Sequence, residues 1–147
     1  MSYDAVEIVE TKYAGRGLVA AKDIEAGKVL FVAPTIRVPR TQYEEHCKFT
    51  VFEDYLFIGR SGDAHLALAL GSIFNHSKHP NILWNLDEEQ DKITYKSFYA
   101  VKKGEPLTIS YGPWGKQYES PSDEDSNHSS DDDGKDGLHS IFLEDHT

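Results

Sequence analysis

The sequence predicts a single, mainly β domain followed by an acidic tail. Short apolar runs recur along the first two thirds of the chain, and turn residues separate them. The last thirty residues instead concentrate acidic and small polar residues. With 147 residues and 39% hydrophobic content, the chain can bury one modest core, and a second full domain is not expected.

Six runs are expected to form strands, because β-branched, aromatic or alternating apolar residues fill each of them. They lie at 6–8, 18–20, 29–32, 82–86, 93–100 and 107–111. Glycine and acidic residues predict turns at 14–17, 25–28, 87–91 and 102–105. No internal repeat is visible. These features favour a sheet protein built from short antiparallel pieces.

The middle of the chain is expected to hold a short helical insert from Thr41 to Leu70. Thr41 is a candidate N-cap, with Glu44 three residues later. A Leu/Ala stretch follows Asp63 and stops at Gly71. This second stretch is ambiguous, because its leucines alternate as in a strand while alanine and leucine favour helix.

Almost all of the net charge of −10 lies in residues 119–147. This tail has ten acids and one lysine, whereas residues 1–118 have fifteen acids and fourteen bases. Residues 120–137 contain no aromatic or branched aliphatic side chain, so we expect them to be disordered. The final LHSIFLEDHT is apolar again and could pack on its own body or on a partner chain, or simply end a solvated tail.

Several classes of protein are excluded by composition. No apolar run approaches the roughly 20 residues that cross a bilayer, and the N-terminus lacks a signal-peptide pattern, so we expect a soluble intracellular protein without a membrane partner. The single cysteine, Cys47, excludes an internal disulfide framework and a cysteine-cluster zinc site. It is interpreted as a small apolar filler, with an exposed thiol as the alternative. No direct nucleic-acid site is evident.

Two glycine-bearing motifs could carry chemistry. Tyr13-Ala14-Gly15-Arg16-Gly17-Leu18 allows a sharp turn and a close backbone approach to a ligand, although taken alone it is better explained as a tight hairpin. It lacks the third glycine and the helix of a dinucleotide fingerprint. The second motif, GEPLTISYG at 104–112, ends a strand on Tyr111, which in isolation would be a packing residue.

A third motif, FNHSKHPN at 74–81, concentrates polar side chains directly after an apolar approach. His76 and His79 lie three residues apart, but no carboxylate or cysteine in the segment completes a ligand set, so no metal is predicted. A buried, hydrogen-bonded polar cluster is the ordinary alternative.

In their order and spacing these motifs resemble the SET domain of protein lysine methyltransferases. Asp54-Tyr55-Leu56-Phe57, ahead of the Leu/Ala stretch, adds a fourth element, and the resemblance runs from about Val6 to Gly115. The short insert is similar to that of compact SET domains without accessory zinc modules. The chain departs from many members where an acidic tail replaces a cysteine-rich C-terminal zinc element.

The resemblance implies a β-clip fold of short strands with a pseudoknot, in which the Asn-His-Ser segment is threaded beneath the loop that carries the later tyrosine. It implies residues 1–118 as the SET domain and 119–147 as a tail. It also implies S-adenosylmethionine as cofactor, with Tyr118 a further candidate to cover its adenine side. The cofactor contacts that it implies are Arg16, Gly17, Leu18, Asn75, His76, Tyr111 and Trp114.

The same resemblance implies that Tyr111 and Tyr55 are catalytic-site tyrosines and that Tyr55, Phe57 and Ile109 line the lysine channel. A tyrosine two residues before the catalytic one restricts family members to one methyl group, and Ile109 at that position implies dimethyl or trimethyl product. The implied activity is methylation of a histone tail in the nucleus by a homodimer. A methyltransferase for another protein, or a non-catalytic SET-fold module that binds histones or methyl-lysine, is the alternative.

Overall fold

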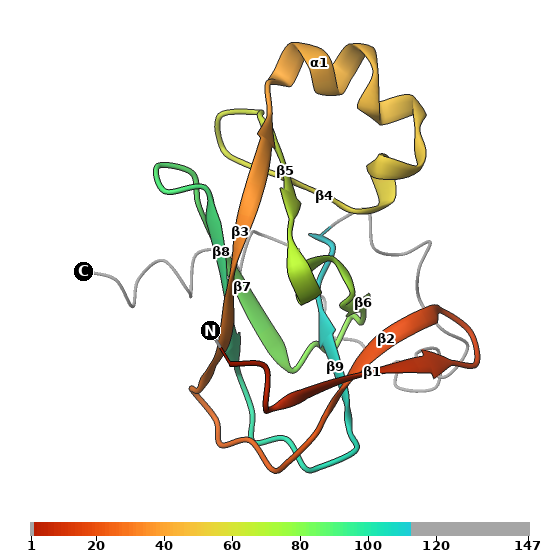
Figure 1. Ribbon diagram of the computed structural model, residues 1–147, viewed down its shortest axis with the longest axis vertical. Helices are drawn as coiled ribbons and strands as arrows, with labels where there is room; N and C mark the ends of the chain where they lie inside the picture. The colour runs from red at the N-terminus through yellow and green to blue at the C-terminus, as the bar shows by residue number, and fades with distance from the viewer. Residues whose placement is uncertain (1, 113–147) are drawn as a thin grey trace, which may run out of the picture.

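A computed structural model of the chain describes residues 2–112 and shows the expected mainly β architecture (Figure 1). In chain order its elements are β1 Val6–Thr11, β2 Gly15–Ala20, β3 Val29–Val38, α1 Arg40–Glu45, the 3-10 turns η1 Cys47–Phe49 and η2 Val51–Asp54, β4 Leu56–Ile58, β5 Ala64–Ala67, η3 Ala69–Ser72, β6 Asn75–His76, β7 Ile82–Asp87, β8 Lys92–Ser97 and β9 Pro106–Ile109. The predicted fold class is therefore confirmed.

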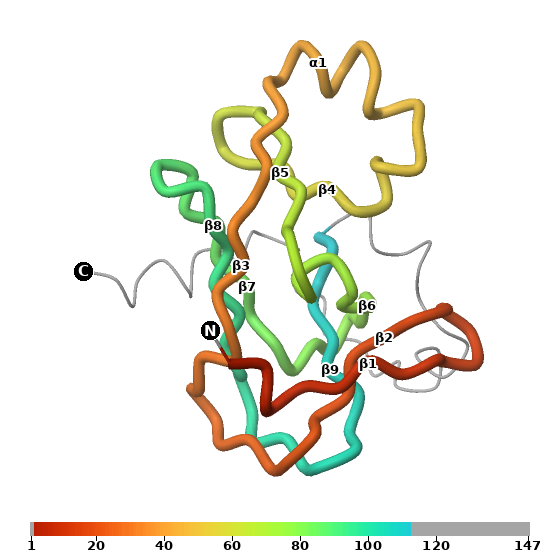
Figure 2. Tube along the Cα trace, in the orientation of Figure 1, coloured from red at the N-terminus to blue at the C-terminus, as the bar shows by residue number. Residues whose placement is uncertain are grey.

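The described strands form two sheets. One has the order β1-β2-β9-β6 and the other the order β4-β5-β3-β8-β7. All described strand pairs are antiparallel except β6 and β9, which run parallel. The chain therefore reaches β9 only after passing through the second sheet, and Figure 2 shows β6 and β9 side by side where these distant segments meet.

The hairpin of β1 and β2 differs in detail from the predicted turn at 14–17. Gly15 has φ of +66°, a left-handed conformation that suits glycine, and pairs with Thr11. Arg16 and Gly17 already lie within β2, opposite Glu10 and Val9. Arg16 and Gly17 therefore belong to strand β2 and not to the turn itself.

β3 continues well past Pro34, where the sequence predicted an end. The strand pairs with β8 up to Pro34 and with β5 from Thr35 onward. Pro34 therefore lies where one neighbour replaces the other, and the backbone N–H that proline lacks costs least at such a break in the ladder. The Pro34 carbonyl still accepts from the backbone N–H of Leu68 at 2.9 Å.

The insert is only partly helical, so the prediction of a helical segment from Thr41 to Leu70 is wrong beyond Asp54. α1 begins at Arg40 after Pro39, and Thr41 lies inside the helix instead of capping it. Thr50 is the capping residue that the structure does show, accepting from the N–H of Phe52 at the start of η2. The Leu/Ala stretch forms β5 and the turn η3, because pairing with β3 and β4 outweighs its helix propensity.

The core lies between the two sheets. Tyr95 and Ile93 of β8, Phe31 of β3, Phe74 and Leu107 belong to one buried cluster. The Phe74 and Tyr95 rings lie 4.6 Å apart and the Phe31 and Tyr95 rings 5.0 Å apart, as centroid distances. This aromatic packing fixes the end of η3 and the start of β6 against β8.

A buried polar cluster joins the insert to the β7–β8 turn. His65 is fully buried, its Nδ1 lies 3.0 Å from Thr35 Oγ1 and its Nε2 lies 3.4 Å from Glu88 Oε1. Glu88 also accepts from Ser61, while Arg37 donates to Asp63 and Asp91. The turn is therefore held by hydrogen bonds to side chains 23 to 54 residues earlier in the chain.

None of the helices in the described part of the chain is long and apolar enough to cross a membrane. Cys47 is half-buried in η1 as a free thiol. The expected disorder of residues 120–137, the apolar C-terminal end, Trp114 and Tyr118 all lie outside the described residues.

Candidate functional site

Two segments separated by about thirty residues cross at the centre of the candidate site. Asn75 and His76 of β6 pair in parallel with Thr108 and Ile109 of β9. The Ser77 N–H then donates to the Ile109 carbonyl at 3.0 Å. The third sequence motif is thereby hydrogen-bonded alongside the strand that precedes Tyr111, as the pseudoknot resemblance implies.

Asn81, the last residue of the FNHSKHPN motif, binds the backbone of β9 through its side chain. Its Nδ2 donates to the Pro106 carbonyl at 2.8 Å, and its Oδ1 accepts from the Thr108 N–H at 2.9 Å. One amide side chain thus satisfies two backbone groups of a neighbouring strand. This explains why the motif ends in asparagine, a role that sequence analysis did not assign.

Tyr111 is held at both its backbone and its hydroxyl. Its N–H donates to His76 Nδ1 at 2.9 Å, and its hydroxyl donates to the Phe74 carbonyl. Because Nδ1 accepts, the neutral imidazole carries its proton on Nε2. The two rings lie 5.2 Å apart, and both residues are at least partly buried. The structure therefore brings together two of the predicted site residues with a defined tyrosine orientation.

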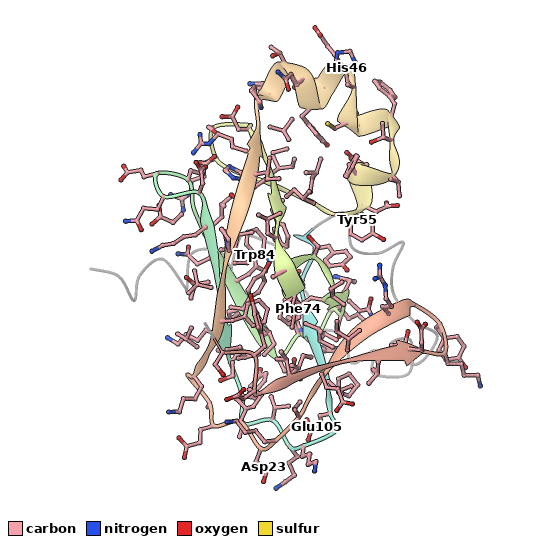
Figure 3. The ribbon with its side chains drawn as sticks, in the orientation of Figure 1. Asp23, His46, Tyr55, Phe74, Trp84 and Glu105 are labelled. Carbon is pink, nitrogen blue, oxygen red and sulfur yellow. The ribbon has the colours of Figure 1, made fainter. Side chains whose placement is uncertain are left out.

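Trp84 is a site residue that sequence analysis missed. Its Nε1 donates to the Ser110 carbonyl at 3.0 Å, next to Tyr111, and its ring meets Phe57 edge-on at 5.0 Å. Phe57, a predicted channel residue, is thereby connected to the Tyr111 segment. The only available signal was a tryptophan within an expected strand, which is not specific. Figure 3 shows Trp84 and Phe74 in the middle of the molecule, below the insert.

The predicted cofactor contacts of β2 lie directly against β6. A Cβ added to Gly17 would come within 2.6 Å of Asn75 Nδ2 and 2.9 Å of Thr11 Cγ2, so only glycine permits this approach. Leu18 is buried and Arg16 is exposed beside it. Asn75 is half-buried, and its side-chain amide makes no hydrogen bond to another described residue. This amide and the neighbouring cation suit the polar groups of S-adenosylmethionine.

The remaining predicted residues occupy different environments. Tyr55 is exposed immediately before β4, and Figure 3 shows it at the lower edge of the insert. Ile109 is 1% exposed and belongs to the core cluster, beside His76 in the register. The lysine channel shared by Tyr55 and Tyr111 stays a prediction.

Tyr95 belongs to the core cluster against which Tyr111 packs. Its hydroxyl donates to the Gly71 carbonyl at 2.8 Å, and burial, with a smaller contribution from nearby Tyr111, raises the pKa of Tyr95 above its usual value. Tyr95 is consequently neutral at all physiological pH values and acts as a fixed hydrogen-bond donor. Within residues 2–112, no group of three or more His, Cys, Asp or Glu side chains is arranged to hold a metal ion.

Comparison with known sequences identifies a family and a curated relative. The SET domain profile matches residues 15–112 of the chain. A histone-lysine N-methyltransferase of Schizosaccharomyces pombe, specific for H3 lysine-37, is 37% identical over 107 residues. The alignment covers 73% of this chain and 73% of that protein.

Solved structures share the fold. A Plasmodium falciparum protein described as a histone methyltransferase superposes with a TM-score of 0.56 at 20% identity, covering 74% of this chain and 94% of that one. The Chaetomium thermophilum polycomb repressive complex 2 contains a matching region with a TM-score of 0.64 at 23% identity, covering 80% of this chain and 16% of that one. At these identities the structures support the fold alone.

Proposed function

Because the chain belongs to the SET-domain family of protein lysine methyltransferases, we propose that it methylates lysine side chains of a histone. The observation that carries the proposal is the fixed Tyr111, whose backbone and hydroxyl are both held by the β6 segment. Together the two hydrogen bonds fix the direction in which the tyrosine presents its oxygen. The named activity of the fission yeast relative supports histone as the substrate class.

S-Adenosylmethionine, the methyl donor of the family, supplies an activated methyl group on a positively charged sulfur. In this proposal the Asn75 amide and the backbone around Gly17 bind its polar part. Arg16, exposed on the same strand, contributes positive charge for a carboxylate. His76 keeps the Tyr111 backbone in place by accepting its N–H.

Tyr111 positions the methyl group during its transfer and offers it a polar contact. Its hydroxyl proton is directed to the Phe74 carbonyl, so the oxygen lone pairs face away from that bond and can accept weak C–H contacts from a methyl group. Holding the reacting groups in line supplies most of the expected rate gain, because alignment removes much of the entropic cost of reaction. No step requires Tyr111 to lose its proton.

The substrate lysine must arrive as a neutral amine, although its free pKa is about 10.4. Aromatic side chains lower that pKa by removing water around the ammonium form. Phe57 and Trp84, which pack edge to face, and Tyr55 at the insert are the groups that would enclose the lysine stem. With the methyl donor bound, the neutral amine would form the new N–C bond as the S–C bond breaks, and the resulting methylammonium would lose its extra proton to water.

The distribution of charge supports a basic substrate. Residues 119–147 hold nearly all of the net charge of −10. Such a segment raises the local concentration of lysine-rich histone tails by electrostatic attraction. Histone methylation also places the protein at chromatin, and therefore in the nucleus.

The proposal is tested by incubating the purified full-length chain with a labelled methyl donor and separately with nucleosomes, free histones and a total protein extract. We expect label on a histone lysine. Label on a different protein alone would replace the substrate assignment and keep the activity. Binding of histone without any transfer, and without binding of S-adenosylmethionine, would favour a non-catalytic module.

A homodimer is also part of the proposal. Phe49, Val51 and Phe52 are exposed on η1 and η2, which is unusual for neighbouring large apolar side chains. A symmetric contact through this surface would cover them in both copies. Light scattering of the active protein at several concentrations tests it, and a strictly monomeric active species would refute it.

A further inference from the structure

The peptide group that joins Ser110 to Tyr111 is held at both of its polar atoms by side chains. Its carbonyl accepts from Trp84 Nε1 at 3.0 Å, and its N–H donates to His76 Nδ1 at 2.9 Å. We call these two hydrogen bonds the peptide clamp. Trp84 belongs to β7 of the five-stranded sheet and His76 to β6 of the four-stranded sheet. Because a peptide group is planar, the clamp fixes its rotation as a unit, and with it the direction in which the chain enters Tyr111.

The peptide clamp lies where the strand pairing of β9 ends. Within residues 2–112, this pairing finishes with the hydrogen bond from the Ser77 N–H to the Ile109 carbonyl. Two residues past the strand's next residue, the chain already turns, because Gly112 has φ of +73° and its N–H donates to Ser110 Oγ at 3.1 Å. Side chains therefore take over from the strand ladder at the residue that presents its hydroxyl to the reaction.

Trp84 holds its side of the clamp in a fixed direction. An indole N–H can only donate, so its bond to the Ser110 carbonyl has one possible sense. The ring is half-buried against the core cluster and meets Phe57 of β4 edge-on, with centroids 5.0 Å apart and planes at 69°. In the pairing of β7 with β8, Trp84 lies opposite the fully buried Tyr95. Packing of the ring therefore sets the position of the N–H.

We propose that Trp84 is a positioning residue for methyl transfer. Through the Ser110 carbonyl it sets the plane of the peptide group before Tyr111, and hence the direction in which the Tyr111 hydroxyl faces the methyl group. The inference rests on the proposed methyltransferase function and deepens it. It concerns the indole N–H alone, whereas enclosure of the lysine stem concerns the aromatic ring.

A purely structural hydrogen bond would behave differently from a positioning one. If Trp84 only satisfied a carbonyl, its loss would lower stability and leave the turnover of the folded protein unchanged. If Trp84 directs Tyr111, its loss lowers kcat while KM is kept, because the alignment counts in the transition state and not in the bound ground state. The effect must also pass through the Tyr111 hydroxyl, so prior removal of that hydroxyl should remove most of it.

Two substitutions separate the N–H of Trp84 from its ring. Trp84→Phe keeps an aromatic ring and removes the donor, whereas Trp84→His keeps a ring N–H at the equivalent position and loses the six-membered ring. With free histones and labelled S-adenosylmethionine, we expect Trp84→Phe to lower kcat about fivefold or more with KM nearly unchanged. Trp84→His should keep the higher kcat of the two and raise KM for the histone. The opposite order of the two kcat values would overturn the proposal.

A double-mutant cycle with Tyr111→Phe tests the route of the effect. We expect Trp84→Phe to lower kcat by less than about twofold once the Tyr111 hydroxyl is absent. A drop of equal size in both backgrounds would show that Trp84 does not act through Tyr111. Ser97→Ala is the matched control, because it removes a hydrogen bond from a side chain to the Glu25 carbonyl, away from the clamp. It should lower stability and leave kcat unchanged, and a similar fall in kcat would mean that lost stability explains both variants.

Exchange of the Tyr111 amide proton with solvent, followed by NMR on the full-length chain, tests the clamp without turnover. In Trp84→Phe this proton should exchange about fivefold faster or more, relative to the amide of buried Ile93, because its bond to His76 loosens when the carbonyl is released. Unaltered exchange would overturn the clamp even with transfer intact. Faster exchange in the variant, together with no transfer by the wild-type chain, would instead refute the proposed function and leave the clamp standing.

Discussion

The backbone N–H of Tyr111 donates to His76 Nδ1 at 2.9 Å, which ties the end of β9 to a segment thirty-five residues earlier. The hydroxyl of the same tyrosine donates to the carbonyl of Phe74, two residues before His76. Both restraints on Tyr111 therefore come from one short segment. A change in that segment should disturb the position of the tyrosine as well as the binding of the methyl donor.

Replacing Tyr111 with phenylalanine removes the hydroxyl and keeps the ring. We expect methyl transfer to fall at least tenfold, equivalent to about 1.4 kcal/mol in the activation barrier, while the fold is kept. Initial rates with labelled methyl donor measure the effect. Tyr99→Phe, the same change at an exposed position packed on Phe98, is the control and should be neutral. Equal rates for the two variants would remove Tyr111 from the mechanism.

Replacing Asn75 with alanine removes the amide that lies against Gly17. We expect binding of S-adenosylmethionine to weaken about tenfold or more, because hydrogen bonds to a half-buried amide are lost. Titration calorimetry measures the affinity, and circular dichroism confirms the fold. His79→Ala, an exposed change in the same motif, should leave the affinity unaltered. A folded Asn75→Ala protein with normal affinity would contradict the assignment.

The strands and the order of the motifs could be predicted because both depend on local sequence. Apolar periodicity located β1, β2, β7, β8 and β9 to within a few residues. The pairing of β6 with β9 could not be derived from periodicity, because two residues carry no repeat, and only the family resemblance supplied it. Asn75, His76 and Tyr111 were predicted as site residues from the motif resemblance, not from geometry.

Other features were missed because tertiary contacts decide them. β5 pairs with strands on both sides, so its alanines and leucines are extended despite their helix propensity. Pro34 appeared to end a strand, but β3 merely exchanges partners there. Trp84 reads as an ordinary strand residue until its contact with the Ser110 carbonyl is seen.

Acid should weaken the polar cluster that holds the β7–β8 turn. Burial opposes ionisation of Glu88, but hydrogen bonds from Ser61 and His65 outweigh it and hold the pKa of Glu88 below its usual 4.5. A lowered pKa in the folded state stabilises the protein above the unfolded-state pKa, and this contribution is lost as pH falls through the folded-state value. Asp63, whose pKa is lowered by the Arg40 backbone N–H and by Arg37, acts in the same direction.

We therefore expect the stability difference between the wild-type protein and Glu88→Gln to be largest near neutral pH and to shrink as pH falls below about 4.5. Urea unfolding followed by tryptophan fluorescence at a series of pH values measures it. Glu89→Gln, one residue along and exposed, should show no such dependence. A difference that stays constant through the acid range would rule out the contribution assigned to Glu88.

Removal of residues 120–147 should show whether the tail attracts the substrate electrostatically or completes the active site. Transfer to a short peptide should be largely retained, since every predicted site residue up to Tyr111 is kept. Activity on intact histones should become less sensitive to salt, because the acidic attraction that salt screens is gone. Rates on both substrates at low and high salt decide this. Collapse of the peptide rate would mean that the tail completes the active site.

The number of methyl groups added should exceed one. A hydroxyl near the reacting amine could hold a water and stop a methylated amine from turning, but the position two residues before Tyr111 is Ile109, which has none. The hydroxyls of Tyr111 and Tyr95 both donate to backbone carbonyls, of Phe74 and Gly71, so neither proton is directed at a water beside the amine. A monomethylated amine therefore has room to realign and react again. Mass spectrometry of a histone peptide at long reaction times should show dimethyl or trimethyl lysine, and an unmodified peptide with arginine in place of lysine controls for background. Monomethyl product alone, at complete turnover of substrate, would show that another side chain supplies the missing hydroxyl.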